Sequence, residues 1–331
     1  MGILLSVLDV APVEQGASAA DALRTTTALA RHAEDLGCER FWVAEHHGHH
    51  NVASSSPAVV LATLAERTSR IRLGAGGVLL LNHSPLAVAE QFGTLNALHP
   101  NRFDLGIGRA AGGNAQAAGM LRRLPDARFA EELDSLMRLL AGGFSDVSAV
   151  PPYSGPLWLL GSSPSSARHA AELGLPYAFA HHVKPEHTSE SVALYRREFV
   201  PGFLAEPYAM VCVLVVCAAD DSGARRLADP GYLSYLRAPQ APYPRPGQVL
   251  SAEEREWVDR RQAYQAIGGP STVFARLDTL LGSVAPDELM VTSMVTDQDA
   301  KLESLSRVHD LLCAWPSAPS ASARQGLGSP G

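Results

Sequence analysis

The sequence predicts a (β/α)₈ barrel, the TIM-barrel fold, as a single domain over residues 1–316. Short apolar runs alternate with amphipathic helical patterns along most of the chain, which is typical of a parallel sheet with crossover helices. There are eight such runs, and their scarcity of polar residues fits strands that are buried on both faces. Eight βα units favour a closed barrel over an open, doubly wound sheet.

In the first half of the chain, the segment 3–9 (ILLSVLD) predicts the opening strand. The segment 18–37 then places apolar side chains at helical spacing and ends on Gly37, a residue favoured just after helices. Proline at the first turn supports two of the later helices. The expected strands are 3–9, 40–45, 71–76 and 102–108, and the expected helices are 18–37, 57–69 and 85–100.

The second half continues the alternation, with two segments that do not fit it. Residues 142–156 and 229–262 are expected to be insertions at the C-terminal face, and the second is predicted to be a long loop, either a lid or a passive surface excursion. Residues 317–331 are rich in Ser, Ala, Gly and Pro, which predicts a disordered tail. The remaining expected strands are 157–161, 177–182, 209–218 and 288–293, and the helices are 126–141, 165–174, 186–199, 220–228 and 270–282.

Composition excludes several functional classes. Of the 331 residues, 46% are hydrophobic and 18% charged, which describes a soluble globular protein. The formal net charge is −7 with no long basic run, which disfavours nucleic acid and anionic membranes as partners on electrostatic grounds. No segment approaches the roughly 20 apolar residues needed to cross a bilayer. The four cysteines show no C-x-x-C spacing, which fits a reducing cytoplasm.

Polar residues follow the expected strands at the points where each strand ends. In a barrel these points all lie on the C-terminal face, where catalytic groups gather. We therefore expect one shared site there. The residues are Asp9; Glu45, His46 and His47; Gly76 and Gly77, with Asn82 and His83 beyond; Gly108 and Arg109; Gly161, Ser162 and Ser163; and His181 and His182.

The segment FWVAEHHGHHN (41–51) carries four histidines within five positions. His46 and His50, four residues apart, could bind a metal together with Glu45. That spacing requires a helix, whereas this segment leaves a strand, so metal binding is the weaker interpretation. For His49 and His50 we expect a structural or solvated role.

Three glycine- or serine-rich turns are candidates for cofactor binding. GIGRAA (106–111) matches the relaxed dinucleotide fingerprint but lacks its acidic residue about 20 positions on. Arg109 is better interpreted as an anion ligand, with a surface salt bridge as the alternative. GSSPSSARHAAELG (161–174) offers hydroxyls and backbone N–H groups at a helix start, suited to phosphate, although simple N-capping by Ser162, Ser163 or Ser165 is also plausible. The glycines of GAGGVLLLNHSP (74–85) allow close approach of a flat ring, or merely a tight turn.

With these motifs in place, the chain resembles the luciferase-like flavin-dependent monooxygenases, the superfamily of the bacterial luciferase α subunit. The resemblance covers most of the chain, and the block from Ser54 to Ala110 is the most specific part. It implies a (β/α)₈ barrel, FMN used as FMNH2 from a separate flavin reductase, and activation of O2 as a flavin C4a-peroxide. A deazaflavin is the less favoured cofactor. The other matching segments are FWVAEHHG, LWLLGSSPSSARHAAELGLPYAFAHH and DELMVTS.

The resemblance also assigns roles to residues. His46 falls at the position of the histidine that lies beside the flavin and supports the peroxide chemistry, without a metal, and His47 is the second catalytic candidate. Ser162 stands where luciferase has a carboxylate, Gly108 where it has a reactive cysteine, and GRAAGG (108–113) replaces the more usual GRAPG. The candidate cofactor-binding residues are Ala75, Gly76 and Gly77 at the isoalloxazine ring, Asn82, and Arg109, Ser162, Ser163 and Ser166 at the phosphate.

The sequence therefore predicts an FMNH2-dependent monooxygenase acting on a small organic substrate. The composition, rich in alanine, glycine and arginine, is associated with high-GC actinobacteria and suggests a role in secondary metabolism. The alternatives are a flavin-binding barrel without catalysis and, less favoured, a metal-dependent barrel hydrolase. We also expect a homodimer packed through helices 57–69 and 85–98, because Val60, Leu64, Val88 and Phe92 exceed what one barrel face needs.

Overall fold

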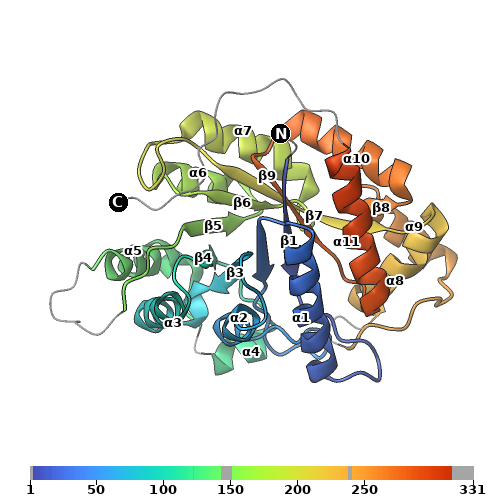
Figure 1. The fold of residues 1–331 in the computed structure, drawn as a ribbon, viewed down its shortest axis with the longest axis horizontal. Helices are drawn as coiled ribbons and strands as arrows, with labels where there is room; N and C mark the ends of the chain where they lie inside the picture. The colour runs from blue at the N-terminus through green and yellow to red at the C-terminus, as the bar shows by residue number, and fades with distance from the viewer. Residues whose placement is uncertain (1–2, 122, 143–150, 238–240, 315–331) are drawn as a thin grey trace.

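The computed structural model describes residues 3–121, 123–142, 151–237 and 241–314, and Figure 1 shows its strands surrounded by helices. Eight parallel strands follow one another in the order β6-β5-β4-β3-β2-β1-β9-β7, and pairing of β6 with β7 closes the ring. The predicted (β/α)₈ barrel is confirmed. Its strands are β1 (Leu4–Asp9), β2 (Arg40–Val43), β3 (Arg72–Leu79), β4 (Phe103–Gly108), β5 (Leu157–Gly161), β6 (Tyr177–Ala180), β7 (Ala209–Cys217) and β9 (Glu288–Thr292).

Seven of the eight outer helices that the structure describes form where the apolar periodicity predicts them. In α1, Ser18 accepts a hydrogen bond from the Asp21 N–H in a capping box, and Gly37 beyond its end takes a positive φ of 79°, a conformation that glycine adopts without strain. The helices that surround the barrel are α1 (Ala19–Asp35), α2 (Pro57–Ala65), α3 (Pro85–Leu98), α5 (Phe129–Leu140), α6 (Pro164–Glu172), α7 (Thr188–Glu198), α10 (Pro270–Val284) and α11 (Gln298–Cys313). Helix α11 was not expected, nor were α4 (Ala115–Met120) and the short strand β8 (Ala266–Gly268), which pairs in parallel with the carboxyl end of β7.

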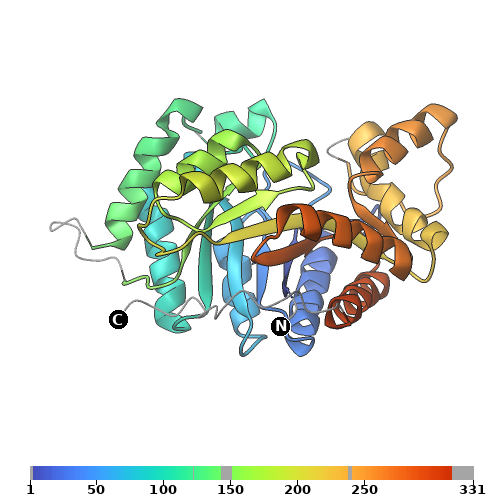
Figure 2. The ribbon, with the colours of Figure 1, turned by 90° about the horizontal axis from the view of Figure 1, so that it is seen from above.

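The prediction of a long loop over residues 229–262 is wrong for most of that segment. Helix α8 (Asp221–Arg237) continues through Pro230, and helix α9 (Ala252–Gln262) follows; Figure 2 shows both at one end of the molecule. Long-range contacts favour the helices over a loop, because Arg255 and Gln262 of α9 donate hydrogen bonds to the carboxylate of Asp229 in α8 and so join the two helices.

Between these helices, backbone bonds join Tyr243 to Val13 and Gln15, in the loop after β1, which places the segment at the C-terminal face. Most of the other expected insertion (142–156) and the expected disordered tail (317–331) lie outside the described residues.

The amino-terminal half of the barrel interior is filled by a buried ionic network and aromatic rings. Arg40, only 2% exposed, donates to Asp104 at 2.8 Å and to Glu288 at 2.7 Å. The next interior layer holds Trp42 and Trp158, packed edge to face with centroids 5.3 Å apart. This end of the barrel is therefore a closed core, and chemistry is confined to the opposite face.

Interior positions near the carboxyl ends of the strands are small or only half-buried. Val10, Gly76, Leu160 and Ala180 all retain some exposure, whereas Trp42 and Trp158, deeper in the barrel, are fully buried. The interior of the barrel is thus reached from this face.

The residues on which the dimer expectation rested have a different role. Leu64, Val88 and Phe92 are buried in the core of their own chain, because α2 and α3 pack against the barrel wall. The large apolar side chains that these helices leave exposed are Val59 and Leu98.

Among the described residues, no helix combines the length and apolarity needed to span a membrane. The four cysteines are free thiols.

Candidate active site

His46 is held at the carboxyl end of β2 by backbone bonds on both sides. Ala44 donates its N–H to the carbonyl of Asp9, and His46 donates its own to Ser54 at 2.9 Å. The half-buried ring leaves Nδ1 buried without a hydrogen-bond partner in the described part of the chain. Burial lowers the pKa of His46 to about 4, with a further contribution from His49. The ring is therefore neutral near pH 7 and has an unused polar atom.

His182 lies near His46, close enough for a positive charge on the His182 ring to lower the pKa of His46 further. Its Nδ1 donates to the carbonyl of Cys212 at 3.1 Å, which leaves Nε2 as the acceptor of the neutral ring. Burial lowers the pKa of His182 to about 4. Two neutral imidazoles thus approach the barrel mouth from β2 and β6.

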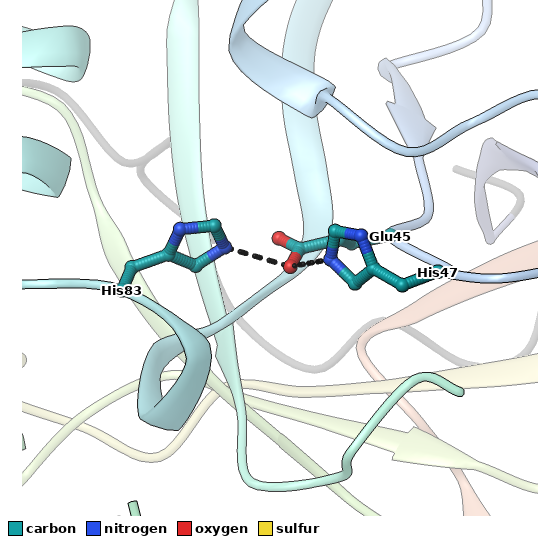
Figure 3. Close-up of side chains that lie close together, drawn as sticks. All are labelled: Glu45, His47 and His83. Atoms are coloured by element: carbon teal, nitrogen blue, oxygen red, sulfur yellow. Dashed lines mark hydrogen bonds and ion pairs between the residues drawn. The ribbon is translucent and has the colours of Figure 1, made fainter. Parts of the chain in front are cut away.

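Beside His46, two histidine side chains converge on one oxygen of the Glu45 carboxylate, as Figure 3 shows. Oε1 of Glu45 accepts from Nε2 of His47 and Nε2 of His83, each at 2.7 Å, while Oε2 accepts the Leu79 N–H at 3.2 Å. Burial raises the pKa of Glu45, but the hydrogen bonds from His83 and His47 outweigh it, so the pKa is lowered overall. Glu45 is therefore an anion that fixes the orientation of the His47 ring.

The glycines after Ala75 are required by the packing of the barrel itself. A Cβ at Gly76 would lie 2.7 Å from Leu8, and one at Gly77 would lie 2.8 Å from the carbonyl oxygen of Gly106. The pairing of β3 with β4 shifts register here, and the Gly76–Gly77 peptide bond is cis. Gly76 is half-exposed towards the mouth, whereas the side chain of Ala75 is buried in the outer core, so Ala75 can offer a ligand only its backbone.

Asn82 links two of the loops. Its Nδ2 donates to the carbonyl of Ala111 at 3.2 Å, while its Oδ1 is buried with no donor in the described part of the chain. The predicted position of Asn82 at the site fits this geometry, because an unpaired buried acceptor is favourable only where a ligand supplies the donor.

The predicted phosphate residues gather at the start of α6. Ser163 is the N-cap: its Oγ accepts from the Ser166 N–H at 3.3 Å, so the simple capping interpretation is confirmed for this residue. The Ser166 hydroxyl lies 2.9 Å from that of Tyr177, and Ser162 is half-exposed. Capping leaves the positive helix end accessible to an anion.

Arg109 is exposed and near α6. The pKa of His169, on the second turn of that helix, is lowered by burial and also by the charge of Arg109. In the described residues no acidic side chain pairs with the Arg109 guanidinium, so the salt-bridge alternative has no partner there.

Two of the polar residues at the strand ends, Asp9 and His181, have structural hydrogen-bond partners instead. Asp9 is buried and accepts hydrogen bonds from Lys301 and Thr26, each at 2.6 Å. The ring nitrogens of His181 lie 2.7 Å from the Thr188 hydroxyl and 2.8 Å from the Tyr264 carbonyl. The sequence missed these partners, and also the pairing of His83 with Glu45, since no local pattern signals them.

Comparison with known proteins places this geometry in context. A family model described as luciferase-like monooxygenase matches residues 1–283. A protein of Escherichia coli K12 named luciferase-like monooxygenase is 37% identical over 328 residues, covering 93% of this chain and 97% of its own.

Two solved structures show the same architecture. Apo-MsnO8 has a TM-score of 0.84 at 36% identity, covering 95% of this chain and 100% of its own. The oxygenating constituent of 3,6-diketocamphane monooxygenase from Pseudomonas putida, a type II Baeyer-Villiger enzyme in complex with FMN, has a TM-score of 0.74 at 16% identity, covering 96% and 100%.

Proposed function

The chain belongs to the luciferase-like monooxygenase family, and from this premise we propose that it is an FMNH2-dependent monooxygenase that oxygenates a small organic molecule. Reduced flavin, delivered by a separate reductase, supplies the electrons that activate dioxygen when it is bound. The observation that carries the proposal is the unpaired, buried Nδ1 of His46 after β2, the strand that pairs with β3, where Gly76 is half-exposed. A neutral imidazole there can exchange a proton with a bound reactant.

The residues at the C-terminal face fit the cofactor in three respects. Gly76, half-exposed at the mouth, presents backbone without a side chain, against which a flat ring can lie. Asn82 offers an unpaired acceptor. Arg109 and the α6 N-terminus, with Ser162, Ser163 and Ser166, supply positive charge and N–H groups for the phosphate.

In this proposal each histidine has its own task. His46 transfers a proton to or from the bound reactant, because its ring is neutral and its Nδ1 is unpaired. His47, held by Glu45, supports the loop that carries His46. The segment 229–262 acts as a cover over the mouth, since it is joined to the loop after β1.

Anaerobic titration with FMNH2, followed by mixing with oxygen, tests the function. We expect saturable binding of FMNH2, weaker binding of reduced riboflavin and no comparable binding of a reduced deazaflavin. Reoxidation of bound FMNH2 should differ in rate from that of free FMNH2. A protein that binds FMNH2 but leaves this rate unchanged, with no product from any substrate, is the non-catalytic alternative. Absence of binding by every reduced flavin overturns the proposal.

For assembly we retain the homodimer through α2 and α3. The support is the exposure of Val59 (68%) and Leu98 (65%), one on each helix. Light scattering should give twice the chain mass at micromolar concentration. A monomeric mass contradicts the dimer and leaves the enzymatic proposal untouched.

A further inference from the structure

The group formed by Glu45, His47 and His83 has the donor set and convergence of a metal site. The carboxylate oxygen and the two imidazole nitrogens all lie within 4.8 Å of one another. Figure 3 shows both rings directing Nε2 at the same oxygen, from loops that follow β2 and β3. Glu45 and His83 are 38 residues apart, so the fold itself assembles the group.

Two imidazole nitrogens and one carboxylate oxygen form a ligand set that holds Zn²⁺ with a remaining position open to water. The observed O···N separations of 2.7 Å are slightly shorter than those between ligands on one tetrahedral ion, so binding requires only a small outward movement. In the ion-free form each ring must carry a proton on Nε2 to satisfy Glu45. A metal ion replaces both protons and uses the same three atoms.

The ligands are supported and accessible. The Leu79 N–H fixes Oε2 of Glu45, and the His47 N–H donates to the Gly112 carbonyl at 2.7 Å. The Glu45 side chain is 1% exposed, whereas those of His47 and His83 are 14% and 28% exposed. An anionic carboxylate at the base, with histidines towards solvent, gives an ion a path of entry and a charge that attracts it.

We propose that Glu45, His47 and His83 bind a divalent transition-metal ion of the Zn²⁺ class at the C-terminal face. The ion connects the loops after β2 and β3, which carry His46 and Asn82. It takes no part in the oxygenation, and its binding does not depend on the proposed flavin chemistry. The histidine pair differs from His46 and His50, the pair that sequence spacing offers.

The test is calorimetric titration of flavin-free protein with Zn²⁺ in a non-chelating buffer, with Co²⁺ absorption as a report on coordination. We expect a single ion per chain with micromolar or tighter affinity, and an upward shift in Tm on binding. Loss of a group that hydrogen-bonds to a metal ligand typically weakens metal binding by about 10–100-fold. His83→Gln removes a ligand itself, so we expect it to weaken Zn²⁺ binding at least as much. Glu45→Gln should act in the same direction.

Matched controls are His49→Gln and His50→Gln, which alter neighbouring histidines outside the group and should leave the affinity within about twofold. Circular dichroism of each variant checks folding, and the half-exposed His83 tolerates substitution best. Absence of Zn²⁺ binding at millimolar concentration overturns the proposal. The proposal is also overturned if His83→Gln keeps the wild-type affinity for Zn²⁺ while His49→Gln or His50→Gln loses it. Since no flavin is present, either outcome leaves the proposed monooxygenase function unaffected.

Discussion

The side-chain amide of Asn82 donates a hydrogen bond to the carbonyl of Ala111, so the turn after β3 supports the loop after β4. The same side chain leaves its Oδ1 buried and unpaired within the described structure. Asn82 thus supports the loop that carries Arg109 and also offers an acceptor to the proposed flavin site. Its two atoms can be separated experimentally, because Asn82→Asp keeps an oxygen acceptor but loses the donor.

We predict that Asn82→Ala weakens FMNH2 binding by about 1–2 kcal/mol, or about 5–30-fold, the cost of losing a neutral hydrogen bond and a loop support. Anaerobic fluorescence titration measures it. Asn96→Ala is the control, since Asn96 also donates to a loop carbonyl, that of Pro152, but far from the mouth. Equal losses in both variants would mean that Asn82 acts only through general stability.

Arg109→Ala should weaken FMNH2 binding by about 1.5–3 kcal/mol, or about 10–150-fold, because a charge-assisted contact to the phosphate is lost. Reduced riboflavin, which lacks the phosphate, should bind the variant and the wild type alike. Arg168→Ala is the matched control, because Arg168 is exposed on α6 but pairs with Glu198 at 2.9 Å. If both flavins lose affinity in Arg109→Ala, the phosphate lies elsewhere.

The ionic network below the site governs stability. Asp104→Asn leaves Arg40 and Arg72 short of a buried counter-charge, and we expect it to lower the free energy of unfolding by about 3–5 kcal/mol. The exposed pair of Arg24 and Asp21 provides the contrast, because Arg24→Ala should cost about 0–1 kcal/mol. Urea denaturation of the wild type, Asp104→Asn and Arg24→Ala measures both effects. Similar midpoints would show that the buried network is not needed for stability.

His182 should make stability depend on pH. Its pKa is lowered by burial to about 4, so protonation favours the unfolded chain, where the pKa is about 6.5. Its contribution is complete above the unfolded value and is lost as the pH falls from there towards the folded value, by about 2 kcal/mol between about pH 7.5 and pH 5.

His182→Asn should reduce the pH dependence by that amount when urea denaturation is repeated at both pH values. His46, His181 and the Cys212 carbonyl are the groups that act on this ring. Because His46 has a similarly lowered pKa, some dependence should remain in the variant. An unchanged slope would show that His182 is not buried as a neutral ring.

Local sequence patterns predicted the barrel because its buried strands consist of continuous apolar runs. The bounds of each predicted strand lie within three residues of the observed ones. The patterns failed where long-range contacts decide. Residues 229–262 were predicted to be a long loop, but most of them are helical, and the Asp229–Arg255 pair joins the two helices. Asp9 suggested a functional carboxylate, yet Lys301, 292 residues away, neutralises it. The pairing of Glu45 with His83 depends likewise on closure of the barrel.

His46 provides the sharpest test of the proposed chemistry. His46→Ala should retain FMNH2 affinity within about tenfold, because the flavin is held mainly by other contacts, while oxygenation of a substrate falls by about 10²-fold or more. Loss of proton exchange should divert the reaction towards release of hydrogen peroxide, which is measured alongside product. His47→Ala is the comparison: its ring is engaged by Glu45, so we expect a smaller loss, with unchanged coupling of oxygen use to product. Normal turnover in His46→Ala would make this residue only a neighbour of the flavin ring, and the proton-carrying role would pass to His182, whose Nε2 is left as an acceptor.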